Sequence, residues 1–183
     1  SSSATMDGPG FPLDDGWIHH TYARNLARDG SWALVPGSPS AGSTSPMWTL
    51  LLLPAYLLGI HPLAWTFLLG ALALVWVGWA SMALWAALWP ERGQPVLAGL
   101  AVVLSWPLVW AAGSGMETLL FAALGLHLAA VYLHAGPRHE VWLGLGAGLL
   151  ILVRPEGLIL LILLATGFAS RRAWRALFLL LLL

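Results

Sequence analysis

Residues 63–89 read LAWTFLLGALALVWVGWASMALWAALW and contain no charged side chain. Because a helix needs about 20 predominantly apolar residues to cross a bilayer, this run predicts a transmembrane helix. The whole chain has the same character: of its 183 residues, 59% are hydrophobic and 9% are charged, and the mean hydropathy is +0.81. Ordinary soluble domains are about 45–50% apolar and about 25% charged. The composition therefore predicts an all-α, polytopic integral membrane protein.

Charge and cysteine content exclude several classes of function. The formal net charge is zero, so the chain has no basic field that would attract nucleic acid. Cysteine is absent, which excludes a disulfide framework, a thiolate metal site and a cysteine nucleophile. The chain begins without an apolar segment and ends within the short apolar run 177–183. We interpret it as a fragment of a longer protein, without the first span.

Breaks that contain proline or glycine divide the apolar part into segments. Residues 141–170 allow two topologies. They form either one span with RPEG (154–157) at its middle or two short passes with RPEG at the turn. A charged residue at the bilayer centre costs roughly 2.5–3.5 kcal/mol on insertion scales. We favour two passes, because the basic cluster 171–175 and the other basic connections then all face the cytoplasm. The expected spans are 63–89, 96–112, 116–135, 139–153 and 157–170, with 173–183 as the start of a further span.

The two-pass topology also decides where the acidic residues lie. Asp14, Asp15, Glu117 and Glu156 all fall on the external side. The apolar segment Met47–Ile60 then begins and ends on that side, and its length of about 21 Å is short of a roughly 30 Å bilayer core. We therefore expect a juxtamembrane helix there. Residues 1–62 are predicted as the first external loop and residues 63–183 as the transmembrane bundle.

The polar loop before the spans carries most of the chemistry. Residues 14–48 read DDGWIHHTYARNLARDGSWALVPGSPSAGSTSPMW. Asp14 suits the N-cap of a short helix that ends near Gly30, and Ser45 followed by Pro46 suits the start of the next helix. Adjacent carboxylates beside a bilayer are costly unless they do chemistry, bind a cation or face water. A helix cap with a solvated neighbour is the structural alternative.

This loop, together with GSGMET at 113–118 and RPEG at 154–157, resembles the GT-C glycosyltransferases. The resemblance is to their arabinofuranosyltransferase- and mannosyltransferase-like branch, which is related to protein mannosyltransferases and aminoarabinose transferases. There the first external loop opens with Asp-Asp, continues through Tyr-Ala-Arg-Asn-Leu and ends in Gly-x-Thr-Ser-Pro-x-Trp. The resemblance implies a GT-C-like helical bundle in the cytoplasmic (inner) membrane, with an active site on the external, periplasmic face. It also implies inverting transfer from a polyprenyl-phosphate-linked sugar to a hydroxyl of a glycan, lipid or protein.

The resemblance further implies roles for individual residues. Asp14 would be the base for the acceptor hydroxyl, with Asp15 in support or as ligand of a divalent cation such as Mg, Mn or Ca. Arg154 would bind the lipid-linked phosphate, because a guanidinium stays charged and makes forked bonds. Two structural alternatives stay open. Glu117 can simply occupy the first turn of a helix, where the helix dipole favours a carboxylate. Arg154 can form an ion pair with Glu156 or Glu117. The other substrate-binding candidates are Tyr22, His20, Arg24, Trp48, Glu117 and Glu156.

Three positions depart from the family pattern. His19 and His20 stand where the family more often has a hydroxyl residue and an aromatic one. Adjacent residues of a helix point in different directions, so these two histidines are not a metal pair. We expect them to be polar surface, and a role in the choice of acceptor is the alternative. Ala41 replaces a residue that is often acidic, which argues against a binding role there.

Two other functions compete with the enzyme. One is a polytopic transporter or flippase of a lipid-linked sugar, but transporters usually keep their polar sites near the bilayer midplane. The other is a catalytically inactive accessory subunit of the same fold.

Overall fold

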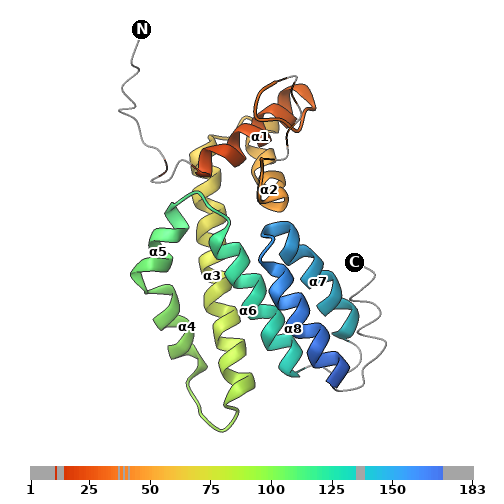
Figure 1. Cartoon of the computed structure of the whole chain (residues 1–183). Helices are drawn as coiled ribbons and strands as arrows, with labels where there is room; N and C mark the ends of the chain where they lie inside the picture. Colours follow the sequence, from red (N-terminus) through yellow and green to blue (C-terminus); the bar gives the residue numbers. More distant parts are fainter. Residues whose placement is uncertain are drawn as a thin grey trace.

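A computed structural model describes residues 11, 15–36, 38, 40, 42–134 and 139–170 (Figure 1). These residues form helices and one isolated bridge between Val35 and Ser38, so the prediction of an all-α fold is confirmed for this part of the chain. The helices are α1 (Asp15–Asp29), α2 (Pro46–Leu57), α3 (Pro62–Leu88), α4 (Pro95–Val103), α5 (Trp106–Gly113), α6 (Thr118–His134), α7 (Glu140–Val153) and α8 (Gly157–Ser170).

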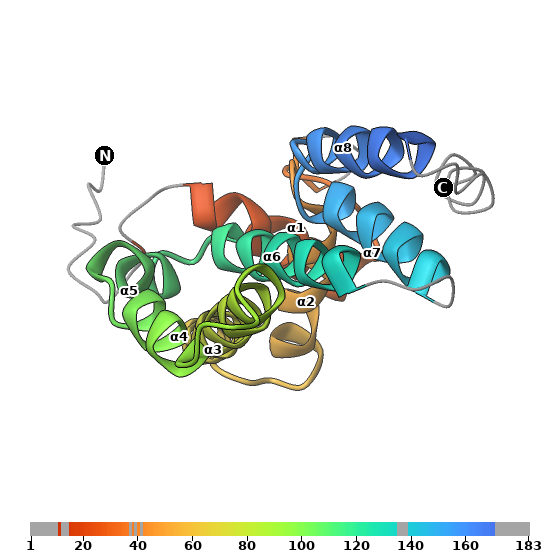
Figure 2. The ribbon, with the colours of Figure 1, turned by 90° about the horizontal axis from the view of Figure 1, so that it is seen from below.

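The helices form a bundle with a cap at one end. α1 and α2 lie together at that end, and the connection between α3 and α4 lies at the other (Figure 1). α6 runs between α3 and α7, with α4 and α5 on one flank and α8 on the other (Figure 2). Two apolar clusters hold α6 in this central place. One contains Val77, Ala111 and Leu119, and the other contains Leu128, Leu143, Leu150 and Leu164.

α3 is the one helix in the described ranges that is long and apolar enough to cross a membrane by itself. Its 27 residues match the expected span. α4 and α5 pass the same test only together, and they are bent by 55° at their junction. Residues 96–112 are therefore not one continuous helix, and whether α4 and α5 together cross the membrane stays a prediction. Pro107 explains the break, because its ring has no N–H and would clash with the preceding turn of a continuous helix.

Residues 141–170 form two helices. α7 and α8 lie side by side and are joined by residues 154–156 (Figure 1). A side chain at Gly157 would run into the backbone of Leu150 and Ile151, so this glycine lets the two helices approach closely. The prediction of two helices with RPEG at the turn is thus confirmed, whereas membrane crossing by each helix stays a prediction.

The loop helices also follow the sequence closely. Ser45 caps α2 by accepting a hydrogen bond from the Trp48 backbone N–H at 3.4 Å. α2 has 12 residues and ends before Gly59, whose φ of +69° turns the chain toward α3. The expected helix over 47–60 is therefore distinct from the first long helix. Asp14, Ala41, the basic cluster 171–175 and the further span 173–183 lie outside the described residues.

Candidate functional site

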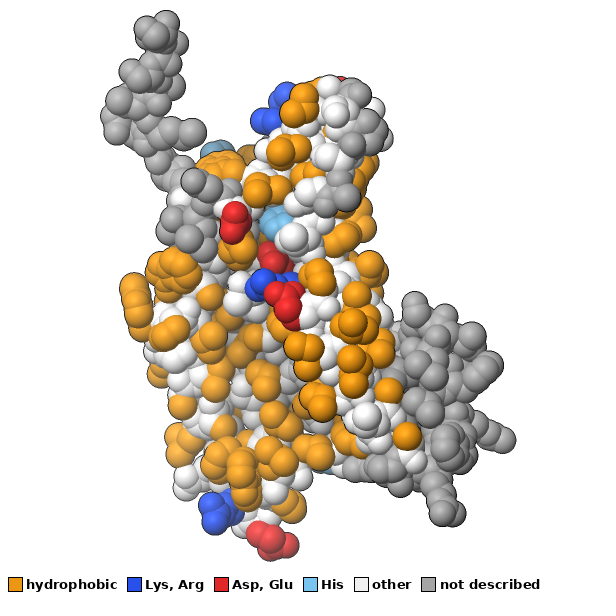
Figure 3. Space-filling model, viewed as in Figure 1, with side chains coloured by type: hydrophobic (Ala, Val, Ile, Leu, Met, Phe, Trp, Pro, Cys, Tyr) orange, Lys and Arg blue, Asp and Glu red, His pale blue; other side chains and the backbone are white. Residues whose placement is uncertain are grey.

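Three stretches that are far apart in the sequence meet at the capped end of the bundle. They contribute His19 from α1, Glu117 from the turn before α6, and Arg154 from the junction of α7 and α8. Figure 3 shows acidic, basic and histidine side chains gathered at one place on this face, with hydrophobic side chains around them. Glu117 and Glu156 lie at the same end of the bundle as the polar loop, because His19 contacts Glu117 and Arg154 contacts both carboxylates. That this end is external stays a prediction.

Glu117 is the centre of this cluster. Its side chain is buried at 1% exposure, with Oε1 3.6 Å from Arg154 Nε and Oε2 3.5 Å from His19 Nε2. Oε2 has no hydrogen-bond partner. A charged carboxylate is rarely this deeply buried unless it is paired. Glu117 therefore does more than occupy a helix N-terminus, because it joins two other elements.

The turn around Gly115 fixes Glu117. Gly115 has a φ of +81°, and its carbonyl accepts a hydrogen bond from the Trp48 indole N–H at 3.0 Å. Ser114 Oγ accepts a hydrogen bond from the Met116 backbone N–H at 3.3 Å. The Trp48 bond connects the turn to α2. The Ser114 bond holds the backbone of Met116, the residue before Glu117.

His19 is buried, contrary to the expectation of polar surface. The reason is that α1 packs the face that carries His19 and His20 against its neighbours. His19 Nδ1 lies 3.3 Å from Ser43 Oγ and 3.4 Å from Thr49 Oγ1. Burial lowers the pKa of His19, and the negative charge of Glu117 opposes that shift. His19, Ser43 and Thr49 were missed as site residues, because only the folded loop brings them together.

Arg154 lies between two carboxylates. Its side chain is 32% exposed, and Nη2 donates to Glu156 Oε1 at 3.0 Å while Nε faces Glu117. A backbone hydrogen bond at Glu156 and the nearby Arg154 charge keep the pKa of the Glu156 carboxyl below its usual value. Both ion pairs considered for Arg154 are present in the structure.

His20 forms a second buried cluster, which joins three helices. Its Nδ1 lies 2.7 Å from the Tyr56 hydroxyl on α2, and its Nε2 lies 3.0 Å from Thr66 Oγ1 on α3. Thr66 donates its own proton to the Pro62 carbonyl, so its oxygen accepts from His20 Nε2. Burial, followed by the effect of His19, lowers the pKa of His20 to about 4. Because Tyr56 and Thr66 occupy both ring nitrogens of His20, neither nitrogen is left for the substrate contact predicted from the resemblance.

Tyr22 and Trp48, two further binding candidates, are also buried and bonded within the protein. The Tyr22 hydroxyl lies 2.6 Å from Ser40 Oγ and accepts a hydrogen bond from the Gly42 backbone N–H at 2.8 Å. Trp48 is 2% exposed. These two side chains organise the loop after α1 and its junction with the bundle.

The remaining candidates lie nearer the surface or outside the described residues. Asp14, the expected base, lies outside them. Asp15 is exposed at the start of α1, and its charge acts to raise the pKa of His19. Arg24 is exposed on the same helix. Within the described ranges, no group of three or more histidine, cysteine or acidic residues could hold a metal ion, so the role of Asp15 as a metal ligand stays a prediction.

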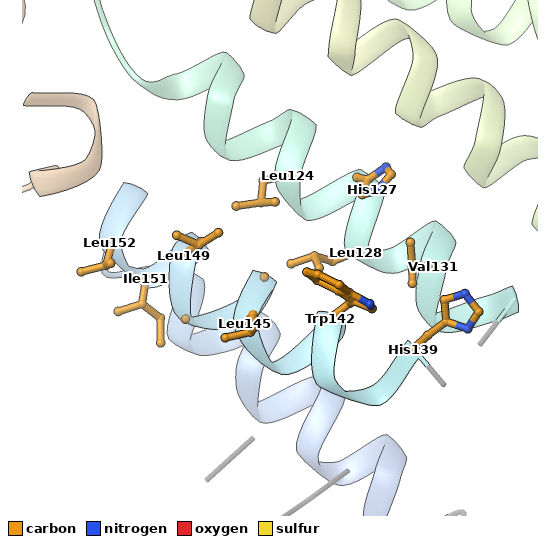
Figure 4. Close-up of a pocket in the computed structure, with 12 residues that line it drawn as sticks. Leu124, His127, Leu128, Val131, His139, Trp142, Leu145, Leu149, Ile151 and Leu152 are labelled. Atoms are coloured by element: carbon orange, nitrogen blue, oxygen red, sulfur yellow. The ribbon is translucent and has the colours of Figure 1, made fainter. Parts of the chain in front are cut away.

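A separate cavity of about 810 Å³ lies between α6 and α7 (Figure 4). Its walls are mostly leucine, glycine and tryptophan, and His127 and His139 are the histidines beside it. The His127 ring stacks on Trp79 with ring centroids 5.1 Å apart. No residue of the Glu117 cluster lines this cavity. Its walls contain no carboxylate and no arginine that could serve an acceptor hydroxyl or a phosphate, so the charged cluster is the better candidate site.

Comparisons of this chain with protein-family models, with curated proteins and with solved structures found no match.

Proposed function

We propose that this chain is part of a GT-C-type membrane glycosyltransferase that moves a sugar from a polyprenyl-phosphate donor to an acceptor hydroxyl. One observation carries the proposal. The three motifs that resemble this enzyme family meet on one buried carboxylate, Glu117, through His19 and Arg154. Motifs that matched by chance would have no reason to converge in space.

Arg154 is the proposed phosphate-binding residue. Its guanidinium presents five N–H donors in a fixed fork, and the contact with Glu156 engages only one nitrogen by a hydrogen bond. Glu156 is 53% exposed in its side chain, so it can move into water when a phosphate takes its place. Buried Glu117 then holds the guanidinium in position.

The acceptor hydroxyl is proposed to bind beside the start of α1. Asp14, with Asp15 in support, suits the role of general base there, since proton removal makes the acceptor oxygen a better nucleophile. The oxygen attacks the sugar carbon, and the bond from that carbon to the phosphate oxygen breaks with the electron pair left on phosphate. A single displacement of this kind inverts the sugar carbon.

The proposal includes a multi-pass topology. Large apolar side chains of α3, among them Leu72, Val75 and Trp79, are exposed on the bundle and suit contact with lipid. We place the bundle in the cytoplasmic membrane, with the Glu117 cluster at the external face. A transporter would be expected to carry polar groups at a broken helix near the midplane. The bent pair α4 and α5, within 95–113, contains no charged residue, which favours the enzyme.

Transfer by the full-length protein tests the proposal. Membranes that contain wild type, Asp14→Asn, Arg154→Gln or the control Arg92→Gln would be supplied with radiolabelled polyprenyl-phosphate sugars. Arg92 is exposed in the α3–α4 connection, at the opposite end of the bundle. We expect the first two variants to lose transfer and the control to keep it.

The other outcomes identify the competing functions. Movement of the labelled lipid across the bilayer without transfer would indicate a transporter. Neither transfer nor movement by the wild type would indicate an inactive subunit. Equal transfer by wild type and Arg154→Gln would remove Arg154 from the phosphate site.

A further inference from the structure

The cavity between α6 and α7 begins close to the Arg154 cluster and runs away from it. Leu152, two residues before Arg154, lies at one end of the cavity wall, and His139 lies at the other end (Figure 4). Because a helix rises 1.5 Å per residue, the wall that α7 contributes is about 20 Å long. α6 contributes residues from Leu124 to Val131 to the facing wall. The cavity is therefore an elongated groove that follows two neighbouring helices.

The groove has an apolar lining and one open side. Trp142, Leu145 and Leu149 of α7 line it, and all three are exposed although their side chains are large and apolar. Among the described residues that line the groove, none carries a carboxylate or a guanidinium. In the proposed multi-pass topology this open side faces lipid. An apolar molecule then enters the groove from the bilayer without passing through water.

The width of the groove decides what kind of molecule it fits. Spread over about 20 Å of helix, the cavity volume of about 810 Å³ corresponds to a channel about 7 Å across. A helix with its side chains is about 10–12 Å across, so a further helix would cover the groove rather than fill it. One extended hydrocarbon chain fits this width, since apolar carbon atoms pack about 4 Å apart.

We propose that this groove holds the hydrocarbon chain of the donor lipid while the phosphate of the same lipid binds Arg154. The inference rests on the proposed function, which places the phosphate at Arg154. The guanidinium is partly exposed beside the Leu152 end of the groove, and a lipid with one anionic head and one long chain matches both features. Each added part of the chain covers more apolar wall. Donor affinity therefore rises with chain length until a length of about 20 Å fills the groove.

Photocrosslinking to the full-length protein in lipid nanodiscs tests where the chain lies. One probe is a polyprenyl phosphate with a diazirine close to the phosphate, and a second carries the diazirine further along the chain. We expect the first probe to label residues 149–152 and the second to label residues 139–142, with both labels reduced at least fivefold in Arg154→Gln. A phosphatidylglycerol probe with a diazirine in its acyl chain represents ordinary bilayer lipid. Equal labelling of the groove by that probe, or labelling that ignores the position of the diazirine, would overturn the proposal.

A groove-filling variant tests the dependence on chain length. Leu145→Trp adds bulk about halfway along the groove, at an exposed position. Ile159→Trp is the matched control, because Ile159 is exposed on α8 and does not line the groove. We expect Leu145→Trp to weaken binding of a long polyprenyl phosphate at least fivefold and to leave binding of the short citronellyl phosphate unchanged, and Ile159→Trp to affect neither. Unchanged binding of the long lipid to Leu145→Trp would refute the groove.

Both experiments measure binding and need no sugar transfer, so they separate this inference from the proposed function. Ordered labelling of the groove in a protein that shows no transfer would support the groove and refute the glycosyltransferase. Normal transfer, together with labelling that ignores the position of the diazirine, would refute the groove and leave the enzyme in place.

Discussion

The Trp48 indole N–H donates a hydrogen bond to the Gly115 carbonyl at 3.0 Å, across 67 positions of sequence. The indole is buried, and it packs with Ala23 of α1 and Leu52 of α2. A polar bond inside an apolar cluster is directional, so it fixes where the turn before α6 meets α2. Glu117 is two residues beyond Gly115, and its position depends on this bond.

Trp48→Phe should weaken this junction. Phenylalanine keeps most of the apolar contact but removes the donor and leaves the Gly115 carbonyl unpaired. We expect the free energy of unfolding to fall by about 1–3 kcal/mol, measured by denaturation of the detergent-solubilised protein. Trp106→Phe is the matched control, because Trp106 is 73% exposed. Equal stability of the two variants would show that the bond does not contribute.

Arg154→Gln should leave the buried Glu117 carboxylate without its cation. Breaking a fully buried pair costs about 3–5 kcal/mol. Because the Arg154 side chain is 32% exposed, we expect about 2 kcal/mol, a smaller cost than for a dry pair. The double variant Glu117→Gln/Arg154→Gln should recover part of this loss. A double-mutant cycle with a coupling energy below about 0.3 kcal/mol would contradict the pairing.

His20 should make stability depend on pH. Its pKa is about 4 in the folded protein against 6.5 in the unfolded chain. Between these values the unfolded state binds more protons, so the free energy of unfolding falls as the pH decreases from 6.5 toward about 4. The total loss is about 3 kcal/mol, and it is complete below the folded pKa. His19, whose pKa is also lowered, adds to the slope in the same direction.

Denaturation curves at several pH values check this dependence. His20→Asn should flatten the slope but not abolish it, because His19 remains. His61→Asn, a change at an exposed position before α3, should leave the slope unchanged. An unaltered slope in His20→Asn would mean that His20 does not titrate as described.

Gly115→Ala should destabilise the protein through two effects. The φ of +81° is unfavourable for a residue with a Cβ atom, and that atom would collide with the Phe11 ring. Gly113→Ala, two residues earlier, meets no atom within 4 Å and has no positive φ. We expect a loss of at least about 1 kcal/mol for Gly115→Ala and no loss for Gly113→Ala, as measured by thermal unfolding. Matching midpoints would contradict the strain at Gly115.

The sequence predicted the helices well wherever their ends carry local signals. Pro46 and Pro62 start α2 and α3, and Arg154-Pro155 ends α7, all within a residue or two of the prediction. The bend between α4 and α5 was missed, although Pro107 marks it. Residues 96–112 were predicted as one helix because the sequence is equally apolar on both sides of Pro107.

The site was predicted only in part. Glu117 and Arg154 were identified from their motifs, but their shared contact depends on how α6 packs against α7. The burial of His19 and His20 was missed because a histidine pair looks the same in sequence whether it faces water or a neighbouring helix. Ser43 and Thr49 carry no signal by themselves. They acquire one only when the loop folds back onto α1.

The convergence on Glu117 also imposes an order on biosynthesis. His19 and Glu117 can meet as soon as α6 has emerged from the ribosome, whereas Arg154 follows only after α7 has been made. Until then Glu117 lacks its arginine, and His19 is its contact within the part of the chain already made. The α7–α8 hairpin is made last, and it supplies the positive charge that pairs with Glu117 at the capped end of the bundle.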